Sequence, residues 1–175
     1  MGAGKSTVGR HLAKRLDKRF IDADREIEAR TGVPISVIFE IEGEAGFRRR
    51  EAELIDQLTG ESDIVLATGG GAVLNEDSRH ALKTRGFTIY LCASVDELVA
   101  RTRHDKQRPL LQNSDRPARI AELLEARDPL YREVAHMVVQ TGRPGVDRLG
   151  AAILAALEGG AASLAGTPHQ SPDTP

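Results

Sequence analysis

Several features that define special classes of protein are scarce in this sequence. There is no tryptophan and only one cysteine, Cys92, so no intramolecular disulfide can form, and we expect a cytoplasmic location. No apolar run reaches the roughly 18 residues that cross a membrane, and there is no signal-peptide pattern. The 24 basic and 26 acidic residues nearly cancel. We therefore expect neither a membrane nor a nucleic acid as a partner.

The residues that are present suit one α/β domain over residues 1–158. A short extended piece is predicted at 19–22, and mainly apolar runs predict strands at 63–67, 87–92 and 137–140. Apolar residues at helical spacing predict a helix after Lys5 and further helices at 24–30, 35–41, 43–58, 95–103, 119–134 and 146–157. Strands that alternate with helices predict a parallel sheet covered on both faces, which is a three-layer α/β/α architecture.

Two segments lack this periodicity. Residues 104–117 are polar, charged and interrupted by prolines, which predicts a mobile loop that would act as a lid over a bound nucleotide. Residues 159–175 are rich in Gly, Ala, Ser and Pro and contain no periodic apolar residues, which predicts a disordered tail.

The strongest local motif stands at the start of the chain, directly before a predicted helix. Its residues match the second half of the P-loop pattern G-x-x-x-x-G-K-[ST] and are Gly2, Ala3, Gly4, Lys5, Ser6 and Thr7. Glycines let backbone N–H groups converge on phosphate oxygens, and the helix N-terminus adds a favourable dipole. Lys5 would neutralise the β- and γ-phosphates, and the Ser6 hydroxyl would bind Mg²⁺. The alternative is a glycine-rich tail that leads into a capped helix.

The complete P-loop pattern begins with a glycine and a strand that would lie upstream of Met1. A parallel sheet without that inner strand would expose unpaired backbone on both flanking strands. We therefore expect either that the native protein has roughly ten further N-terminal residues or that this form lacks its first strand. The intact mass of the endogenous protein distinguishes the two.

Two carboxylates follow the first predicted strand. Asp22 and Asp24 share one face in extended geometry, at the strand end where α/β sheets bind ligands. One could reach Mg²⁺ through water, and the other could accept a proton from an acceptor hydroxyl. Helix capping by Asp22 and first-turn charge complementarity by Asp24 explain the same residues more simply.

Arginines and glycines give further candidates. Arg48 heads a run of three helical arginines, of which at most one or two can face a site, and an inward one could hold a carboxylate. Gly69, Gly70 and Gly71 follow a buried strand, where they permit either close approach of a ligand or a plain turn. A basic run from Arg101 to Arg108 suits a lid that brings arginines to a transferring phosphoryl group.

Taken in order, these segments resemble the shikimate kinase family from Met1 to about Leu157. The matching strings are GAGKST, F-I-D-A-D-x-x-I-E, I-F-E-x-x-G-E-x-x-F-R, T-G-G-G-A-V, R-P-L-L and D-P-L-Y-R. Each string is weak or moderate alone, but six of them in the family's order are highly specific. The resemblance implies a P-loop kinase fold and phosphorylation of shikimate by MgATP, with ADP and shikimate 3-phosphate as products.

The resemblance also implies roles for individual residues. On the nucleotide side, Lys5 and Ser6 match the phosphate and Mg²⁺ groups, Asp22 the carboxylate that reaches the metal through water, Arg108 the lid arginine, and Arg101 the residue that packs on adenine. Arg143 is a looser match to an adenine contact. On the acceptor side, Asp24 matches the proposed base, Arg48 and Arg132 the pair that holds the shikimate carboxylate, and Gly70 with Gly71 the backbone that contacts the ring hydroxyls.

Other functions stay open at this point. A gluconate-kinase-like enzyme would also use a carboxylate acceptor, and only the family-specific strings favour shikimate. A nucleoside-monophosphate kinase fits the arginine pair less well. A regulatory nucleotide switch would need an acidic residue at the end of an apolar strand or an Asn-Lys-x-Asp motif. The run Ile64-Val65-Leu66 instead leads into Thr68 and glycines, and no Asn-Lys-x-Asp occurs. An inactive, truncated nucleotide-binding module is the remaining alternative. By resemblance we expect a monomer.

Overall fold

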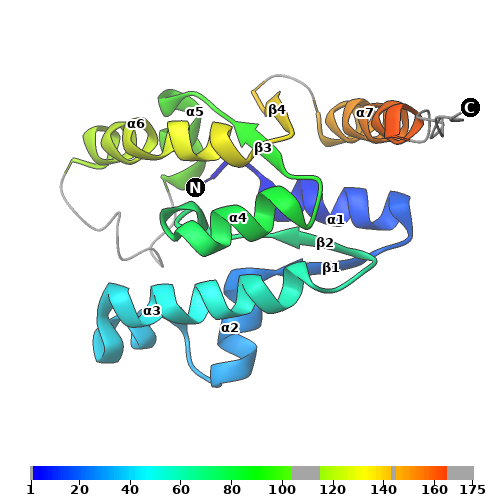
Figure 1. The fold of residues 1–175 in the computed structure, drawn as a ribbon. Helices are drawn as coiled ribbons and strands as arrows, with labels where there is room; N and C mark the ends of the chain where they lie inside the picture. The colour runs from blue at the N-terminus through cyan, green and yellow to red at the C-terminus, as the bar shows by residue number, and fades with distance from the viewer. Residues whose placement is uncertain (1, 104–114, 143–144, 165–175) are drawn as a thin grey trace, which may run out of the picture.

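The computed structural model describes residues 2–103, 115–142 and 145–164, and the chain forms alternating helices and parallel strands (Figure 1). The first half contains α1 (Lys5–Leu16), β1 (Arg19–Asp22), α2 (Ala23–Thr31), α3 (Ile35–Thr59), β2 (Ile64–Ala67), the 3₁₀ helix η1 (Ala72–Leu74) and α4 (Glu76–Thr84). The second half contains β3 (Ile89–Cys92), α5 (Val95–Thr102), α6 (Arg116–Val134), β4 (Met137–Gln140) and α7 (Val146–Leu164). All four predicted strands are confirmed.

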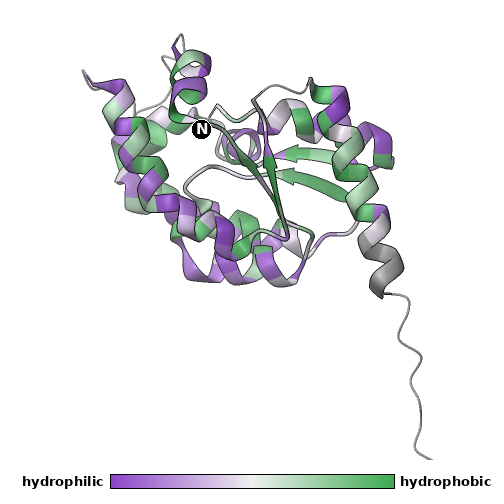
Figure 2. Ribbon diagram, turned by 90° about the horizontal axis from the view of Figure 1, so that it is seen from above, coloured by the Kyte–Doolittle hydropathy of each residue, from purple (hydrophilic) through white to green (hydrophobic). Residues whose placement is uncertain are grey.

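The strands form two separate parallel pairs. β1 pairs with β2 and β3 pairs with β4, and no described residue forms a strand between β2 and β3. The strands are mainly hydrophobic, whereas the helices around them alternate between hydrophobic and hydrophilic residues (Figure 2). Helices therefore cover both faces, as the α/β/α prediction requires.

Three apolar clusters hold the layers together. One joins β1 to α2 and α3 around Ile27, Phe47 and Leu58. A second joins the residues before α1 to α5 and α6, and a third joins α1 to β4 and α7 around Leu12 and Ile153. Full burial of each large apolar side chain contributes about 1.5–3 kcal/mol, so these clusters fix the strand ends relative to one another.

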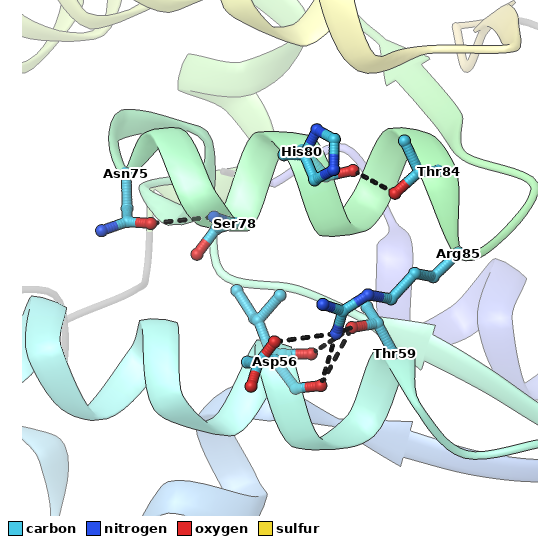
Figure 3. Close-up of polar contacts among 8 residues, drawn as sticks. Asp56, Thr59, Asn75, Ser78, His80, Thr84 and Arg85 are labelled. Carbon is cyan, nitrogen blue, oxygen red and sulfur yellow. Dashed lines mark hydrogen bonds and ion pairs between the residues drawn. The ribbon is translucent and has the colours of Figure 1, made fainter.

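Helix α4 was not predicted. Asn75 caps it by accepting a hydrogen bond from the Ser78 amide at 2.8 Å, and acidic residues fill its first turn (Figure 3). At its other end, Arg85 donates to a carboxylate oxygen of Asp56 at 2.7 Å and so ties α4 to α3. An asparagine followed by two acidic residues is a recognisable helix start, so the signal was present in the sequence.

Three predicted boundaries can be compared with the structure. The break predicted between residues 41 and 43 appears as a kink at Gly43, where φ is 69°. Residues 115–117, expected at the end of the lid, belong to the start of α6, and residues 104–114 lie outside the described residues. Helix α7 continues to Leu164, seven residues beyond the predicted end at residue 157. Among the described residues, no helix is long and apolar enough to cross a membrane.

Candidate active site

The residues that match the P-loop form a tight turn into α1. Gly2 and Gly4 have φ values of 64° and 87°, which side-chain-bearing residues rarely adopt. The Gly4 carbonyl accepts a hydrogen bond from the Val8 amide at 2.9 Å, so the helix begins directly after the glycine. The first amides of α1 consequently point out of the helix end, where a phosphate group can bind them.

Ser6 and Asp22 bring this turn together with the end of β1. The Ser6 hydroxyl donates to a carboxylate oxygen of Asp22 at 2.6 Å. Asp22 is the last residue of β1, and β1 ends beside the start of α1. Two adjacent hard oxygen atoms suit Mg²⁺, which binds one or two protein oxygens and otherwise water and phosphate.

Asp24 and Glu51 converge on the first glycine of the predicted glycine loop. A Cβ atom built on Gly69 would lie 3.1 Å from Oδ1 of Asp24 and would overlap Oε1 of Glu51. Any side chain at position 69 would therefore displace one of these carboxylates. The close approach explains this glycine, and it places Asp24 at the carboxyl end of β2.

Arg48 is held beside the same loop by two acidic side chains. It donates to Glu51 at 2.5 Å and to Glu44 at 3.0 Å, and a Cβ atom on Gly71 would overlap its guanidinium group. Burial alone would lower the pKa of Arg48, but the paired carboxylates of Glu51 and Glu44 outweigh it and raise that pKa. Arg48 is thus a fixed positive charge that faces the glycine loop.

Glu51 is the most deeply buried ionisable group at this site. Its residue is only 2% exposed, and burial raises the pKa of its carboxyl group even though Arg48 opposes the shift. Oε2 accepts the hydrogen bond from Arg48, whereas Oε1 has no partner among the described residues. A buried acceptor of this kind is costly unless it positions another group.

Helix α6 contributes a second buried arginine. Arg127 is 6% exposed and donates to the Gly70 carbonyl at 3.3 Å, and the Tyr131 hydroxyl donates to the same oxygen at 2.5 Å. Burial raises the pKa of the Tyr131 hydroxyl, so it keeps its proton and acts as a donor. These two side chains fix the middle glycine of the loop.

Arg132, predicted as the second carboxylate-binding residue, lies elsewhere. Its side chain is 53% exposed and pairs with Asp128 at 2.6 Å, above the ring of Tyr90. The Asp128 carboxylate also accepts from the Tyr90 hydroxyl at 2.8 Å. Arg127 and Arg132 are five residues apart, so their side chains point about 140° apart around the helix axis. They therefore face different directions. The structure brings Arg127, and not Arg132, to the glycine loop.

Arg101 lies at the nucleotide end of the site. It donates to the Thr141 carbonyl at 2.8 Å, to the Thr141 hydroxyl at 3.0 Å and to the Gly2 carbonyl at 3.4 Å. It therefore joins α5 to the loop after β4 and to the turn before α1. Arg108 and Arg143 lie outside the described residues.

The two ends of the site meet at one cavity. The cavity has a volume of about 810 Å³, and one part of its wall contains Lys5, Gly69, Gly70, Arg127 and Tyr131. Through the contacts of Gly69 and Gly71, the side chains of Asp24 and Arg48 reach the same loop. The predicted phosphate turn therefore lies near Asp24, Arg48 and the glycine loop, whereas Arg132, the remaining predicted acceptor residue, does not reach that loop.

Comparisons with known proteins identify the family of this chain. The family model described as shikimate kinase matches residues 1–158. A shikimate kinase of Burkholderia pseudomallei (strain 1710b) is 59% identical over 158 residues, which is 90% of this chain and 86% of that protein. The chain belongs to the shikimate kinase family.

Solved structures of the family share the fold. A structure of shikimate kinase from Acinetobacter baumannii in complex with shikimate superposes with a TM-score of 0.89 at 48% sequence identity. The superposition covers 91% of this chain and 89% of that chain. A shikimate kinase from Bacteroides thetaiotaomicron gives a TM-score of 0.83 at 32% identity, with 90% and 94% coverage. The predicted P-loop kinase fold is confirmed.

Sequence reasoning missed four residues at this site. They are Glu51, Arg127, Tyr131 and Thr141. Glu51 stands three residues after Arg48, a spacing that usually marks a surface ion pair, so nothing in the sequence singled it out. Arg127 directly precedes the string D-P-L-Y and Tyr131 ends it, and their four-residue separation, which places them on one helix face, was the available signal.

Proposed function

We propose that this chain transfers the γ-phosphoryl group of ATP to a ring hydroxyl of shikimate and releases ADP and shikimate 3-phosphate. One observation carries the proposal: a fixed arginine and a carboxylate lie against the glycine loop, and Gly69 and Gly70 of that loop line the same cavity as Lys5. Binding of a small anionic polyol requires these three kinds of group. The arginine binds its carboxylate, the loop its hydroxyls, and the carboxylate orients the hydroxyl that attacks.

For the acceptor we propose Arg48 and Arg127 as the carboxylate-binding pair, with Arg127 in place of Arg132. Both are arginines with buried or half-buried side chains, and both contact the glycine loop. Gly70 and Gly71 would offer backbone groups to the ring hydroxyls. Glu51 and Tyr131 would not touch the acceptor, and they would hold Arg48 and Gly70 in place.

For the chemistry we propose Asp24 as the base. It would accept the proton of the attacking hydroxyl while the new P–O bond forms and the bond to the ADP oxygen breaks. Lys5, with the amides of residues 2–7, would neutralise the charge that develops on the phosphoryl oxygens. Catalysis would rest mainly on positioning and charge neutralisation, since phosphoryl transfer needs little covalent help from the protein.

Mg²⁺ fits the Ser6–Asp22 pair, in which Ser6 would bind the ion directly and Asp22 through water. Bound there, the ion would neutralise phosphate charge. Arg101 would pack on adenine, since its guanidinium group is held at the nucleotide end by Thr141. Arg108 as a lid arginine and Arg143 as an adenine contact remain predictions from the resemblance. We also propose a cytoplasmic monomer whose partners are small molecules.

The test is ATP turnover by the purified chain with shikimate, gluconate and a set of nucleoside monophosphates as separate acceptors. We expect ADP release to depend on shikimate and phosphorus NMR to detect a phosphate monoester of shikimate. Turnover with gluconate at equal or higher kcat/KM would replace the proposal with a gluconate-kinase-like one. ATP binding without turnover on any acceptor would favour the inactive module.

A further inference from the structure

The phosphate turn packs against the last turn of α5. A Cβ atom built on Gly2 would lie only 2.9 Å from the Cγ2 methyl group of Thr102. The same atom would lie 3.6 Å from a side-chain carbon of Leu98 and 3.7 Å from Cβ of Arg101, which share that face of the helix. On Gly4, by contrast, a Cβ atom would meet nothing within 4 Å. The turn is therefore supported at Gly2 and open at Gly4, where a phosphate group would approach.

The two branches of the Thr102 side chain have different partners. Thr102 is 1% exposed, and its hydroxyl donates to the Leu98 carbonyl at 2.7 Å, within its own helix. The methyl group is the branch that faces Gly2. A serine would make the same hydrogen bond to the carbonyl four residues back. The contact that a serine could not make at this position is therefore the one between the methyl group and Gly2.

Contacts with α6 fix this end of α5. Arg116 of α6 donates to the Thr102 carbonyl at 2.5 Å and to the Arg103 carbonyl at 3.2 Å. The last carbonyls of a helix have no partner within it, so an arginine there supplies the missing donors and a favourable charge. One turn earlier, Leu98 packs in the apolar cluster that also contains Ala3. The Thr102 methyl group is thus firmly placed, and it cannot follow the phosphate turn if that turn moves.

We propose that Thr102 is a positioning residue for nucleotide binding: its methyl group holds Gly2 against α5 and so places the amides of the phosphate turn. This inference rests on the nucleotide site of the proposed function. Glycine-rich turns have many accessible conformations, so an unsupported turn would have to be ordered when the nucleotide binds. A turn that is already packed against α5 avoids that cost. Loss of the methyl group therefore weakens nucleotide binding and leaves acceptor binding unchanged.

The test compares two substitutions that each remove one branch of the Thr102 side chain. Thr102→Ser removes the methyl group, whereas Thr102→Val keeps a methyl group there and removes the hydroxyl. We expect Thr102→Ser to raise the Kd of mant-ATP, a fluorescent ATP analogue, and the KM for ATP about five- to tenfold. Thr102→Val should change both less than about twofold, and neither variant should change the KM for shikimate. Thr59→Ser is the matched control, because Thr59 makes the same kind of bond, to the Ile55 carbonyl at 2.7 Å, at the end of α3.

A double-mutant cycle with Gly2→Ala tests the contact itself. Alanine at position 2 would meet the Thr102 methyl group and would also strain the backbone, because φ is 64° there. Gly2→Ala should therefore weaken mant-ATP binding in the native background. In the Thr102→Ser background the added loss should be at least about threefold smaller, because the methyl group is gone and only the backbone strain remains. A role of Thr102 in stability alone would make the two losses additive.

Three outcomes would overturn the inference. The Kd of mant-ATP could be equal in the native chain, Thr102→Ser and Thr102→Val, or the cycle with Gly2→Ala could be additive. Thr102→Ser could also raise the KM for shikimate as much as the KM for ATP, as a general loss of stability in urea unfolding would do. The Kd is measured without an acceptor, so it does not depend on shikimate. Failure of the proposed function would appear instead as a native chain that binds mant-ATP but does not phosphorylate shikimate.

Discussion

The two ends of the candidate site are built in different ways. On the acceptor side, buried side chains of α3 and α6 converge on the glycine loop, and Glu51, Arg48, Arg127 and Tyr131 each contact another member of the group or the loop backbone. On the nucleotide side, the described polar contacts are single hydrogen bonds from the Ser6 and Arg101 side chains to neighbouring segments, and a Cβ atom on Gly4 would meet nothing within 4 Å. The acceptor side is preorganised by packing, and the phosphate turn is open.

This contrast predicts separable effects of substitution. Changes on the acceptor side disturb a network in which each member positions another, so they should raise the KM for shikimate and leave the KM for ATP nearly unchanged. Changes on the nucleotide side should do the reverse. Asp24 stands between the two and should affect kcat instead.

The largest effect is expected for Asp24→Asn. The amide keeps the shape of the side chain but cannot accept a proton from the attacking hydroxyl, so kcat should fall about 10²- to 10⁴-fold while both KM values change little. Steady-state kinetics with each substrate varied in turn measures this. Asp77→Asn, on the exposed first turn of α4, is the matched control and should keep full activity. Retention of kcat in Asp24→Asn would remove it as the base.

The next largest effect separates two arginines of α6. Arg127→Met should raise the KM for shikimate about 10- to 100-fold, since it removes a buried, charge-assisted contact worth roughly 1.5–3 kcal/mol. Arg132→Met removes the same group five residues later, where it pairs with Asp128 at the surface, and should change that KM less than about threefold. The reverse ranking would restore the prediction made from the sequence.

The two arginines also show what the sequence could and could not specify. Apolar runs and helix signals were enough to locate all four strands and most helices, because burial and backbone hydrogen bonding are local requirements. The direction of one side chain on α6 was not specified, because it depends on how that helix rotates against the glycine loop. The family strings include Arg132 and end one residue after Tyr131, so resemblance alone chose the exposed arginine.

Glu51 illustrates the second limit. An acidic residue three positions after an arginine is an ordinary helical surface pair, and only the packing of α3 against the glycine loop makes it buried. Conversely, the position of the glycines after a buried strand marked them as candidates, either for ligand approach or for a plain turn. Their specific reasons, room for Asp24, Glu51 and Arg48, required the structure.

Glu51→Gln should have a smaller effect that depends on pH. Loss of the charge that holds Arg48 should raise the KM for shikimate about tenfold, or ~1.4 kcal/mol, at pH 8. Because burial raises the pKa of Glu51 above its ordinary 4.5, the native enzyme should lose the same interaction as the pH falls through that raised pKa. The KM of the native chain should therefore rise towards that of the variant on acidification, and the variant's own KM should stay flat.

Acidification should weaken shikimate binding by the native chain but raise its free energy of unfolding relative to that of Glu51→Gln. A carboxyl group with a raised folded-state pKa binds its proton more tightly in the folded chain, so the free energy of unfolding rises as the pH falls through that pKa towards 4.5. The native chain should gain stability relative to Glu51→Gln over this window in urea unfolding. A constant difference between the two would mean that folding does not raise the pKa of Glu51.

The smallest effect is expected on the nucleotide side, for Thr141→Val. Valine keeps the shape of the threonine but removes the hydroxyl that accepts from Arg101, while the stronger bond to the Thr141 carbonyl remains. One neutral acceptor contributes about 0.5–1.5 kcal/mol, so the KM for ATP should rise only about two- to tenfold and the KM for shikimate should not change. Thr84→Val, which removes a hydroxyl that bonds only within α4, is the control. If Thr141→Val raised the KM for shikimate instead, the two ends of the site would not be independent, and the contrast between a packed acceptor side and an open nucleotide side would fail.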